Sequence, residues 1–577
     1  MTQIVEQAKT LPVSHRCDVA VCGGGVAGVA AALAAARTGA KVLLLEREYA
    51  LGGLATLGLI TAYLPLCDGR GHQVSFGIAE ELLRLSVVHG HEDTETCPWL
   101  RSDSTREERI RHRFLTRYNP NVYAVDCERL LDAGVELLYG TVVCGVQKDG
   151  RTITHLIIEN KSGRSAVAAG SVVDATGDAD VCARAGEQTA LFGQGNLLAA
   201  WSYHVSDSRY FLHILGAADV PDSHKTAEQK AADTARRFGG INADELSEMM
   251  QLSHAAMLDD FLAKGPTGST HALAMMPAIP QVRMTRRIVG CATQTEADMH
   301  REFADSVGLY ADWRRPGPVY ELSFATLYGR RVANLITAGR CISTDDALWD
   351  AARVIPVCAV SGQAAGTAAA MSRDFAALDV TALQARLAAD GVVLHERDLV
   401  WELQDTEWDF TFTDHDRQIA RAIVFDESGS YYFVRAVRDD DFGKATLIET
   451  SGGGVEPGEA PEEAIRRELK EELGAEAEIV CKIGVVSDHY NLIHRHNINH
   501  YFLCRAVSFG QTDMTRQETD DFHLSTLKMS YAEAEAEYRR RTDTKLGRLI
   551  ANRELPVLQR AQELLEQFRH GTETSVK

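Results

Sequence analysis

Short apolar runs alternate with an alanine-rich stretch at the start of the chain. Residues 17–22 form an apolar run that leads directly into the glycine-rich turn of residues 23–28. An alanine-rich pattern then continues to Gly39, and a second apolar run from Val42 to Leu45 ends at Glu46. This order predicts a strand, a tight turn, a helix and a second strand, which together form the βαβ unit of a parallel sheet.

Two later apolar runs also end in small residues. Residues 172–173 lead into Asp-Ala-Thr-Gly-Asp at 174–178, and residues 335–338 lead into Gly339. Residues 353–366 read R-V-I-P-V-C-A-V-S-G-Q-A-A-G and open an alanine-rich helical pattern. We expect these segments, 165–186 and 333–372, to join residues 15–60 in one α/β region.

The last third of the chain has a different pattern. Two strand-like runs between residues 417 and 434 flank the turn Asp-Glu-Ser-Gly at 426–429. A triple glycine follows at 452–454, and apolar residues then recur every four positions at 465, 469 and 473. This spacing predicts a helix that begins near Pro461 and ends at Gly474.

The polar face of this helix is strongly acidic. Glu468, Glu471 and Glu472 stand at i, i+3 and i+4, so their carboxylates project from neighbouring turns and repel one another. A hard divalent cation, which prefers oxygen ligands, would relieve this repulsion. A solvated acidic helix is the alternative interpretation, but it does not account for the flanking glycines or for Glu459.

The stretch G-x5-E-x7-R-E-L-K-E-E-L-G-A, from Gly453 to Ala475, resembles the Nudix box. The resemblance implies Mg2+ or Mn2+ held by Glu468, Glu471 and Glu472, with Glu459 completing or orienting the ligand set and Arg467 fixing a glutamate by a bidentate pair. The implied activity is hydrolysis of a compound linked to a nucleoside diphosphate.

The first βαβ unit has the spacing of a dinucleotide site. Gly23 allows the tight turn, Gly25 lets the backbone approach a pyrophosphate, and Gly28 lets the helix pack against the strand. Glu46, about twenty residues on, suits the adenosine ribose hydroxyls. An ordinary βαβ unit with a glycine-rich turn is the alternative interpretation.

With the Leu-Gly-Gly-Leu-Ala-Thr segment at 51–56, the ordered motifs between residues 15 and 395 resemble FAD-dependent oxidoreductases of the glutathione-reductase-like fold. The resemblance implies FAD as cofactor. It places these further residues at the cofactor: Gly53, Gly177, Asp178, Gly339, Gly362, Gln363 and Ala364.

The chemistry of this region is narrowed by two missing motifs. No second GxGxxG unit and no CxxC follow the first helix, so we expect direct oxidation or reduction of a small organic substrate over the flavin. Arg353, just before the late helix, is the best candidate to hold a substrate carboxylate. His72 is better explained as a surface-loop residue, and Arg283 and Arg287 fit structural ion pairs at least as well.

Composition excludes several other classes of protein. The chain has 577 residues, 45% of them hydrophobic and 24% charged, and its net charge of −21 argues against binding to nucleic acid or an anionic membrane. No run of eighteen uninterrupted apolar residues occurs, so no membrane association is expected. Twelve scattered cysteines without zinc or disulfide-reductase spacing indicate reduced thiols in a cytoplasmic enzyme.

The predicted fold is α/β: a Rossmann-like FAD-binding domain with an inserted α+β substrate or cap region (roughly 75–130 and 190–330), then an α/β/α Nudix domain. The predicted boundaries are a leader at 1–14, the flavin region at 15–395, a linker at 396–414 and the Nudix domain at 415–570. Both halves are expected to act on small molecules, one of them a nucleoside diphosphate-linked substrate. The alternative is that the Nudix half senses nucleotides without turnover. The oligomeric state is not indicated.

Overall fold

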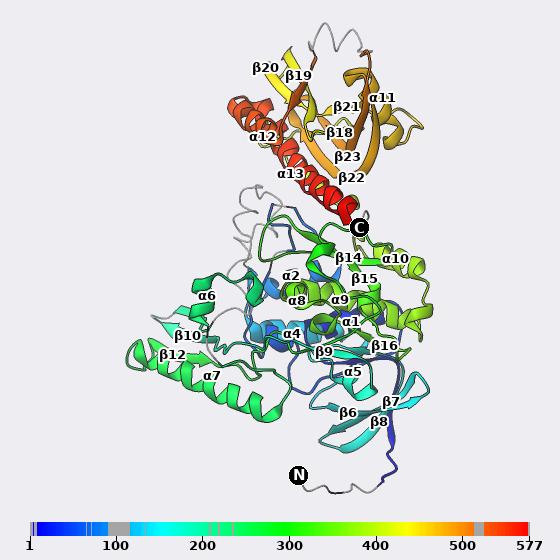
Figure 1. The fold of residues 1–577 in the computed structure, drawn as a ribbon. Helices are drawn as coiled ribbons and strands as arrows, with labels where there is room; N and C mark the ends of the chain where they lie inside the picture. Colours follow the sequence, from blue (N-terminus) through cyan, green and yellow to red (C-terminus); the bar gives the residue numbers. More distant parts are fainter. Residues whose placement is uncertain are drawn as a thin grey trace. The chain divides into compact units, whose positions relative to one another are not determined.

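The computed structural model describes residues 4, 8–64, 66–70, 72–89, 116–132, 134–206, 209–216, 220–233, 236–512 and 524–574. The chain forms two compact units, Met1–Leu394 and His395–Lys577, which are described separately (Figure 1). Six residues of the predicted leader, 1–3 and 5–7, lie outside the described residues, as do residues 90–115 of the expected cap.

The first unit is built on a seven-stranded sheet whose central strands are parallel. The parallel strands lie in the order β5 (Val135–Leu138), β2 (Val42–Leu45), β1 (Val13–Cys22), β8 (Gly163–Asp174) and β16 (Leu335–Thr337). Strand β8 also continues into an antiparallel meander with β7 (Thr152–Asn160) and β6 (Val142–Asp149). Val13 and Ser14, expected in the leader, are the first residues of β1, because Val13 already pairs with Ala166.

Two apolar helices pack against each other over this sheet (Figure 1). They are α1 (Val26–Arg37) and α9 (Ile355–Met371), and their contact faces are almost entirely alanine and glycine. Small residues let the helix backbones approach closely, so a Cβ on Gly366 would lie 2.0 Å from the carbonyl oxygen of Ala31. Further helices pack around this pair: α2 (Ile78–Val88), α4 (Pro120–Leu131), α8 (Asp346–Ala352) and α10 (Val380–Ala389). Helix α5 (Asp180–Ala185) packs in a second core on the opposite face of the sheet.

The segments between the cofactor motifs form a smaller α+β layer on one side of this unit (Figure 1). Its three-stranded sheet has the order β11 (Arg209–His213), β10 (Ser202–Ser206) and β12 (His271–Met275), accompanied by α6 (Ala227–Ala232) and α7 (Ala243–Ala263). The remaining short strand pairs are β3 (Ala62–Tyr63) with β4 (Thr116–Arg117), β9 (Thr189–Leu191) with β13 (Arg286–Ile288), and β14 (Ser306–Ala311) with β15 (Val319–Ser323).

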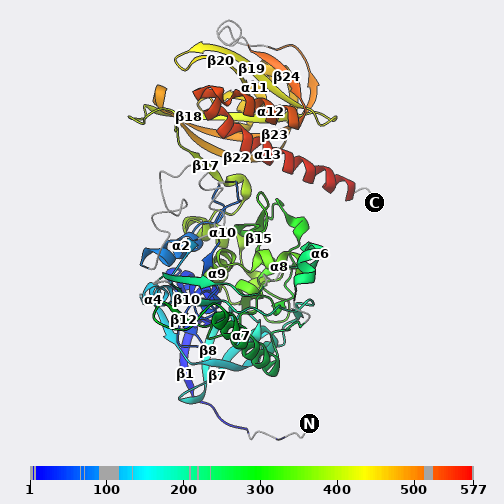
Figure 2. The ribbon, with the colours of Figure 1, turned by 90° about the vertical axis from the view of Figure 1, so that its left-hand side faces the viewer.

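The second unit is an eight-stranded mixed sheet between helices. Its path runs β17 (Val400–Leu403), β22 (Ala475–Tyr490), β23 (Arg495–Phe509), β18 (His415–Phe425), β19 (Tyr431–Asp440) and β20 (Gly443–Glu449), with β21 (Ser451–Gly454) on β18 and β24 (Ser525–Met529) on β19. Helix α11 (Pro461–Leu473) buries its apolar residues against one face. Helices α12 (Tyr531–Arg540) and α13 (Lys545–Thr574) also pack on the sheet (Figure 2).

The segment expected to be a linker, residues 396–414, therefore contributes a strand to the second sheet. Strand β17 pairs in parallel with β22, and Trp401 at its centre is buried. No single helix among the described residues has the length and apolarity needed to cross a membrane. The bent pair α8–α9 meets the length and composition criteria together.

Candidate active sites

The predicted dinucleotide motifs converge on one cavity of about 330 Å³ in the first unit. Segments far apart in the sequence line it together: 23–27, 46–48, 52–55, 175–178, 338–340 and 353–355. Of the predicted cofactor residues, those that line it are Gly23, Gly25, Glu46, Gly53, Gly177, Asp178 and Gly339, together with Arg353. The fold therefore gathers the early and late motifs around one space.

The glycine turn fits the close approach that the sequence predicts. Gly23 has φ +103°, and a Cβ there would lie 2.5 Å from the carbonyl oxygen of Ala175. A Cβ on Gly28 would lie 1.8 Å from the carbonyl oxygen of Gly23, so Gly28 serves packing and not the cavity surface. By contrast, a Cβ on Gly25 would meet nothing within 4 Å. Gly25 is the N-cap of α1, so the positive end of this helix opens toward the cavity.

Glu46 is held in place by backbone amides. Its Oε2 accepts a hydrogen bond from the Gly24 N–H at 2.5 Å, and its Oε1 accepts one from the Glu48 N–H at 2.8 Å. The residue is buried except for the part that lines the cavity. Two fixed donors orient the carboxylate, and lone pairs on both oxygens remain for hydroxyl donors on a ligand.

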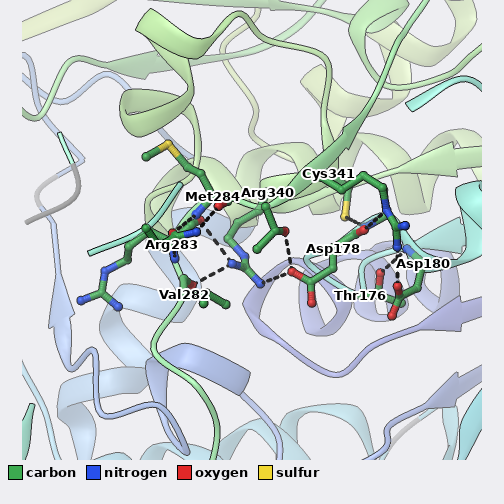
Figure 3. A network of polar contacts seen from close by, with 12 residues as sticks. Thr176, Asp178, Asp180, Val282, Arg283, Met284, Arg340 and Cys341 are labelled. Atoms are coloured by element: carbon green, nitrogen blue, oxygen red, sulfur yellow. Dashed lines mark hydrogen bonds and ion pairs between the residues drawn. The ribbon is translucent and has the colours of Figure 1, made fainter. Parts of the chain in front are cut away.

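Asp178 and Arg340 form an ion pair on the cavity wall (Figure 3). Arg340 Nη2 lies 3.1 Å from Asp178 Oδ1, and Thr285 Oγ1 donates to the same oxygen at 2.6 Å. Arg340 Nη1 also donates to the carbonyl oxygen of Val282 at 2.8 Å. A Cβ on Gly177 would lie 2.5 Å from Arg340 Nη2, so only glycine leaves room for the guanidinium.

Arg353 pairs with the buried carboxylate of Asp350 and also lines the cavity. Its Nε is buried without a hydrogen-bond partner. Nearby, the Cys358 thiol donates to the Arg353 carbonyl oxygen at 3.1 Å, and burial raises the pKa of that thiol to about 11. At neutral pH Cys358 is therefore a protonated, buried side chain and not a thiolate nucleophile.

The other polar candidates occupy different environments. His72 is buried, so the expected surface-loop position is wrong. Its Nδ1 lies 2.8 Å from Asp68 Oδ2, outside the cavity lining. Arg283 lies over the Trp201 ring at 5.0 Å and does line the cavity. Arg287 lies 5.7 Å from the Trp349 ring and does not.

The predicted residues of the late helix lie away from the cavity. A Cβ on Gly362 would lie 2.3 Å from the carbonyl oxygen of Ala27, and Gln363 Oε1 accepts from the Ile78 N–H at 2.9 Å. Ala364 is fully buried. Gly362, Gln363 and Ala364 thus hold α9 against α1 and α2, while residues 353–355 and Cys358 before them line the cavity.

Sequence reasoning missed the apolar part of this cavity. Trp201, Ile279 and Trp313 line it, and each lies between recognisable motifs. Arg340 directly follows the predicted strand and Gly339, but its role on the wall follows only from its contact with Asp178.

In the second unit, α11 begins and ends as predicted. Pro461 is its first residue, and Gly474 is its C-cap with φ +60°, a backbone conformation that favours glycine. Ile465, Leu469 and Leu473 are buried against the sheet, which confirms the predicted apolar stripe.

Two of the box glutamates face a cavity of about 770 Å³. Glu472 Oε2 accepts hydrogen bonds from Ser451 Oγ at 2.6 Å and from the Gly452 N–H at 2.9 Å. A Cβ on Gly453 would lie 2.3 Å from Glu468 Oε1, so the glycine lets this carboxylate reach the cavity. Glu471 is about one-third exposed and does not line the cavity.

Arg467 is the cation that the remaining box carboxylates contact. Its guanidinium lies 2.7 Å from Glu468 Oε1 and 3.3 Å from Glu471 Oε2, and it grips both oxygens of Glu459. Its hydrogen bond to Glu459 is the main cause that raises the pKa of Arg467. Within the described part of the chain, no three His, Cys, Asp or Glu side chains are placed to hold one metal ion. Three glutamates on this helix and Glu459 before it supply carboxylate oxygens, which are the ligands that Mg2+ prefers.

Comparisons with known proteins agree with both resemblances. A family model described as FAD dependent oxidoreductase matches residues 18–198 and 197–387, and a model described as NUDIX domain matches residues 415–548. Both descriptions name enzyme families, and the predicted α/β fold class with its two parts is confirmed.

A curated protein of Haemophilus influenzae, 8-oxo-dGTP diphosphatase, is 42% identical over 57 residues, which is 10% of this chain and 40% of that protein. The chain thus spans about two-fifths of the length of this relative. A NUDIX hydrolase structure from Nitrosomonas europaea shares 19% identity, covering 27% of this chain and 90% of that one, with a TM-score of 0.21. A 3-ketosteroid-delta4-(5alpha)-dehydrogenase structure from Rhodococcus jostii RHA1 shares 15% identity, covering 63% of this chain and 100% of that one, with a TM-score of 0.30.

Proposed function

The chain belongs to the FAD-dependent oxidoreductase family, and from this premise we propose that it is a bifunctional enzyme. One activity oxidises or reduces a small organic substrate with FAD, and the other hydrolyses a nucleoside diphosphate-linked compound with Mg2+ or Mn2+. The observation that carries the first proposal is the convergence of seven predicted cofactor residues and Arg353 on one cavity.

The residues that line this cavity fit FAD. Gly25 leaves open space at the N-terminus of α1 for a pyrophosphate, and the fixed Glu46 carboxylate can accept from ribose hydroxyls. When bound, FAD supplies hydride or electron transfer. Trp201, Ile279 and Trp313 provide an apolar wall that excludes water from an organic substrate, and Arg353 holds an anionic group of that substrate.

The visible spectrum of the purified chain tests the flavin proposal. We expect flavin absorbance that bleaches on addition of a suitable reductant. A colourless protein that cannot be reconstituted with FAD would contradict the proposal.

In the Nudix domain Glu468, Glu471, Glu472 and Glu459 offer the carboxylate oxygens that a hard divalent cation prefers. No three of them converge on one point in the described structure, because Arg467 contacts Glu459, Glu468 and Glu471. When bound, the cation supplies charge stabilisation on the diphosphate. Glu468 and Glu472 present carboxylates to the cavity, while Arg467 keeps Glu459 and Glu471 oriented. For all four glutamates to bind the cation, Arg467 must break its contacts with Glu459, Glu468 and Glu471.

A hydrolysis screen tests this second activity. The full chain is incubated with Mg2+ and, separately, with FAD, NADH, ADP-ribose and 8-oxo-dGTP, with EDTA as the metal-free control. Metal-dependent cleavage of one compound supports an active hydrolase. Tight binding without cleavage of any compound would instead favour the alternative, a nucleotide-sensing module.

A further inference from the structure

Among the described residues, five arginines line the Nudix cavity, and we call three of them, Arg417, Arg421 and Arg495, the arginine trio. Arg417 and Arg421 stand four residues apart on β18, so they share one face of the strand. Arg495 lies on the neighbouring parallel strand β23. The same cavity contains Glu468 and Glu472 of the box, so the trio lies within the space where a diphosphate would be cleaved.

The trio has almost no partners within the protein. In the part of the chain that the structure describes, Arg421 donates only to neutral acceptors, Asn499 Oδ1 at 3.0 Å and the Thr450 carbonyl oxygen at 3.3 Å. The side chains of Arg417 and Arg495 make no hydrogen bond or ion pair with any described residue, and Arg495 Nε is buried. Burial lowers the pKa of Arg417, and the neighbouring Arg495 and Arg421 guanidinia lower it further against the opposing effect of Glu468.

The other two arginines that line the cavity are already paired. Arg438 lies 2.8 Å from Asp440 and 3.4 Å from Glu449. Arg553 lies 3.1 Å from Asp488 and 2.8 Å from Glu554.

Most acids that line the cavity are also engaged. Glu468 pairs with Arg467, and Glu472 accepts from Ser451 and Gly452. Asp441 is the exception, and it is exposed. The positive charge of the trio is therefore not matched by an acid that contacts it.

Clustered guanidinium groups without counter-ions are costly unless a ligand supplies the missing negative charge. The planar fork of arginine matches phosphate oxygens, and a phosphate monoester carries about two negative charges, more than each phosphate of a diphosphate diester. We propose that the ligand of the Nudix cavity carries a phosphate monoester in addition to its diphosphate, and that the arginine trio binds this group. The proposal rests on the proposed function of the Nudix domain as a site for diphosphate-linked nucleosides.

Matched pairs of compounds test the preference in the full chain with Mg2+. NADPH and NADH differ only by a ribose 2′-phosphate, whereas 8-oxo-dGTP and 8-oxo-dGDP differ only by a terminal phosphate. The first pair detects a monoester on the sugar. The second pair differs by a phosphate in anhydride linkage, so it shows whether a longer polyphosphate has the same effect. We expect kcat/KM to be at least about tenfold higher for NADPH than for NADH.

Variants identify the residues responsible. Arg421→Gln and Arg495→Gln should each lower kcat/KM for the preferred compound to near that of its partner, while cleavage of the less phosphorylated partner changes little. Arg435→Gln is the matched control, since Arg435 is exposed on the adjacent strand β19 and does not line the cavity. Equal cleavage of NADPH and NADH, or a preference for NADPH that survives both trio variants, would overturn the proposal.

A binding measurement separates failure of this proposal from failure of the hydrolase. Inorganic tripolyphosphate is titrated calorimetrically into the wild type and the same variants. If no diphosphate is cleaved, the proposed hydrolase activity fails. In that case, tripolyphosphate binding that weakens about tenfold in Arg421→Gln and Arg495→Gln but not in Arg435→Gln still supports phosphate binding by the trio. Binding that is absent, or unchanged in the two trio variants, overturns it.

Discussion

The Cα of Gly28 faces the carbonyl oxygen of Gly23 so closely that a Cβ on Gly28 would lie 1.8 Å from that oxygen. This contact presses the first turn of α1 against the loop that leads from β1 into the cavity. It explains why the turn needs glycine at a position that does not itself line the cavity.

Replacement of Gly28 by alanine should therefore damage the fold. We expect Gly28→Ala to lower the free energy of unfolding by about 3 kcal/mol or more, because the opposing atom is backbone and cannot rotate away. Thermal unfolding of the apoprotein measures this loss. An unchanged melting temperature would show that the turn adjusts freely.

Gly25 offers the contrasting case at the same turn. A Cβ there enters open space and the backbone has φ −65°, so Gly25→Ala should cost no more than about 1 kcal/mol of stability. The methyl group would project into the proposed pyrophosphate position, so FAD affinity should fall at least about tenfold. Fluorescence titration of the apoprotein with FAD measures this change. Normal affinity would place the pyrophosphate elsewhere.

Asp178→Asn should weaken the cavity wall. Arg340 would keep a hydrogen-bond acceptor but lose the negative charge opposite it. We therefore expect the free energy of unfolding to fall by about 1–3 kcal/mol and the flavin content to decrease. Asp180→Asn is the control, since Asp180 pairs with Arg286 and does not line the cavity. Equal flavin loss in both variants would argue for a general structural effect.

Glu472→Gln tests the metal assignment in the Nudix domain. The amide oxygen can still accept from Ser451 or Gly452, so the fold should persist, but hydrolysis should fall about a hundredfold because a charged ligand is lost. Glu471→Gln should also impair hydrolysis, whereas Glu462→Gln, on the exposed first turn of α11, should not. Mn2+ binding followed by electron paramagnetic resonance gives a second readout. Full hydrolysis in both Glu471→Gln and Glu472→Gln would refute the assignment.

His204 should make stability depend on pH. Burial, together with the neighbouring His213 and Lys264, lowers the pKa of His204 to about 4. The unfolded chain, with a histidine pKa near 6.5, then binds more protons than the folded chain between about pH 6.5 and pH 4. The contribution of His204 to stability is therefore complete above about pH 6.5 and is lost as the pH falls through that window.

Chemical denaturation across this range measures the slope. His204→Phe keeps an aromatic ring against Phe261 but cannot titrate, so its stability should vary less between pH 6.5 and pH 4. The same slope in wild type and variant would assign the pH dependence to other groups, among them Asp260, whose pKa is lowered mainly by Lys264.

The sequence predicted those features of the two sites that depend only on neighbouring residues, namely turns and helix ends. The turn at Gly23 and the ends of α11 at Pro461 and Gly474 follow from backbone preferences, which neighbouring residues determine. Helical spacing likewise placed Glu468 and Glu472 on one face of α11. The position of β21 decides that these two reach the cavity while Glu471 does not, and that is a tertiary relationship.

The late helix shows the same limit. Its motif order suggested that Gly362, Gln363 and Ala364 meet the cofactor, yet each is used in packing against α1 or α2. A small residue on a helix serves equally well for close helix packing or for ligand approach, so composition alone cannot distinguish the two. The positions of Trp201 and Trp313 could not be predicted, because the sequence around an apolar residue does not show whether it lines a cavity or packs in the core.

The tight seam between α1 and α9 has a consequence for how the protein is made. These helices are more than three hundred residues apart in the sequence. Residues 353–355 and Cys358, around the start of α9, line the same cavity as Gly23. During translation, which proceeds from the N-terminus at about 5–20 residues per second, the ribosome must release more than half of the polypeptide before that wall can close. The proposed flavin can therefore bind only late in synthesis, because a nascent chain that ends before α9 lacks part of the cavity wall.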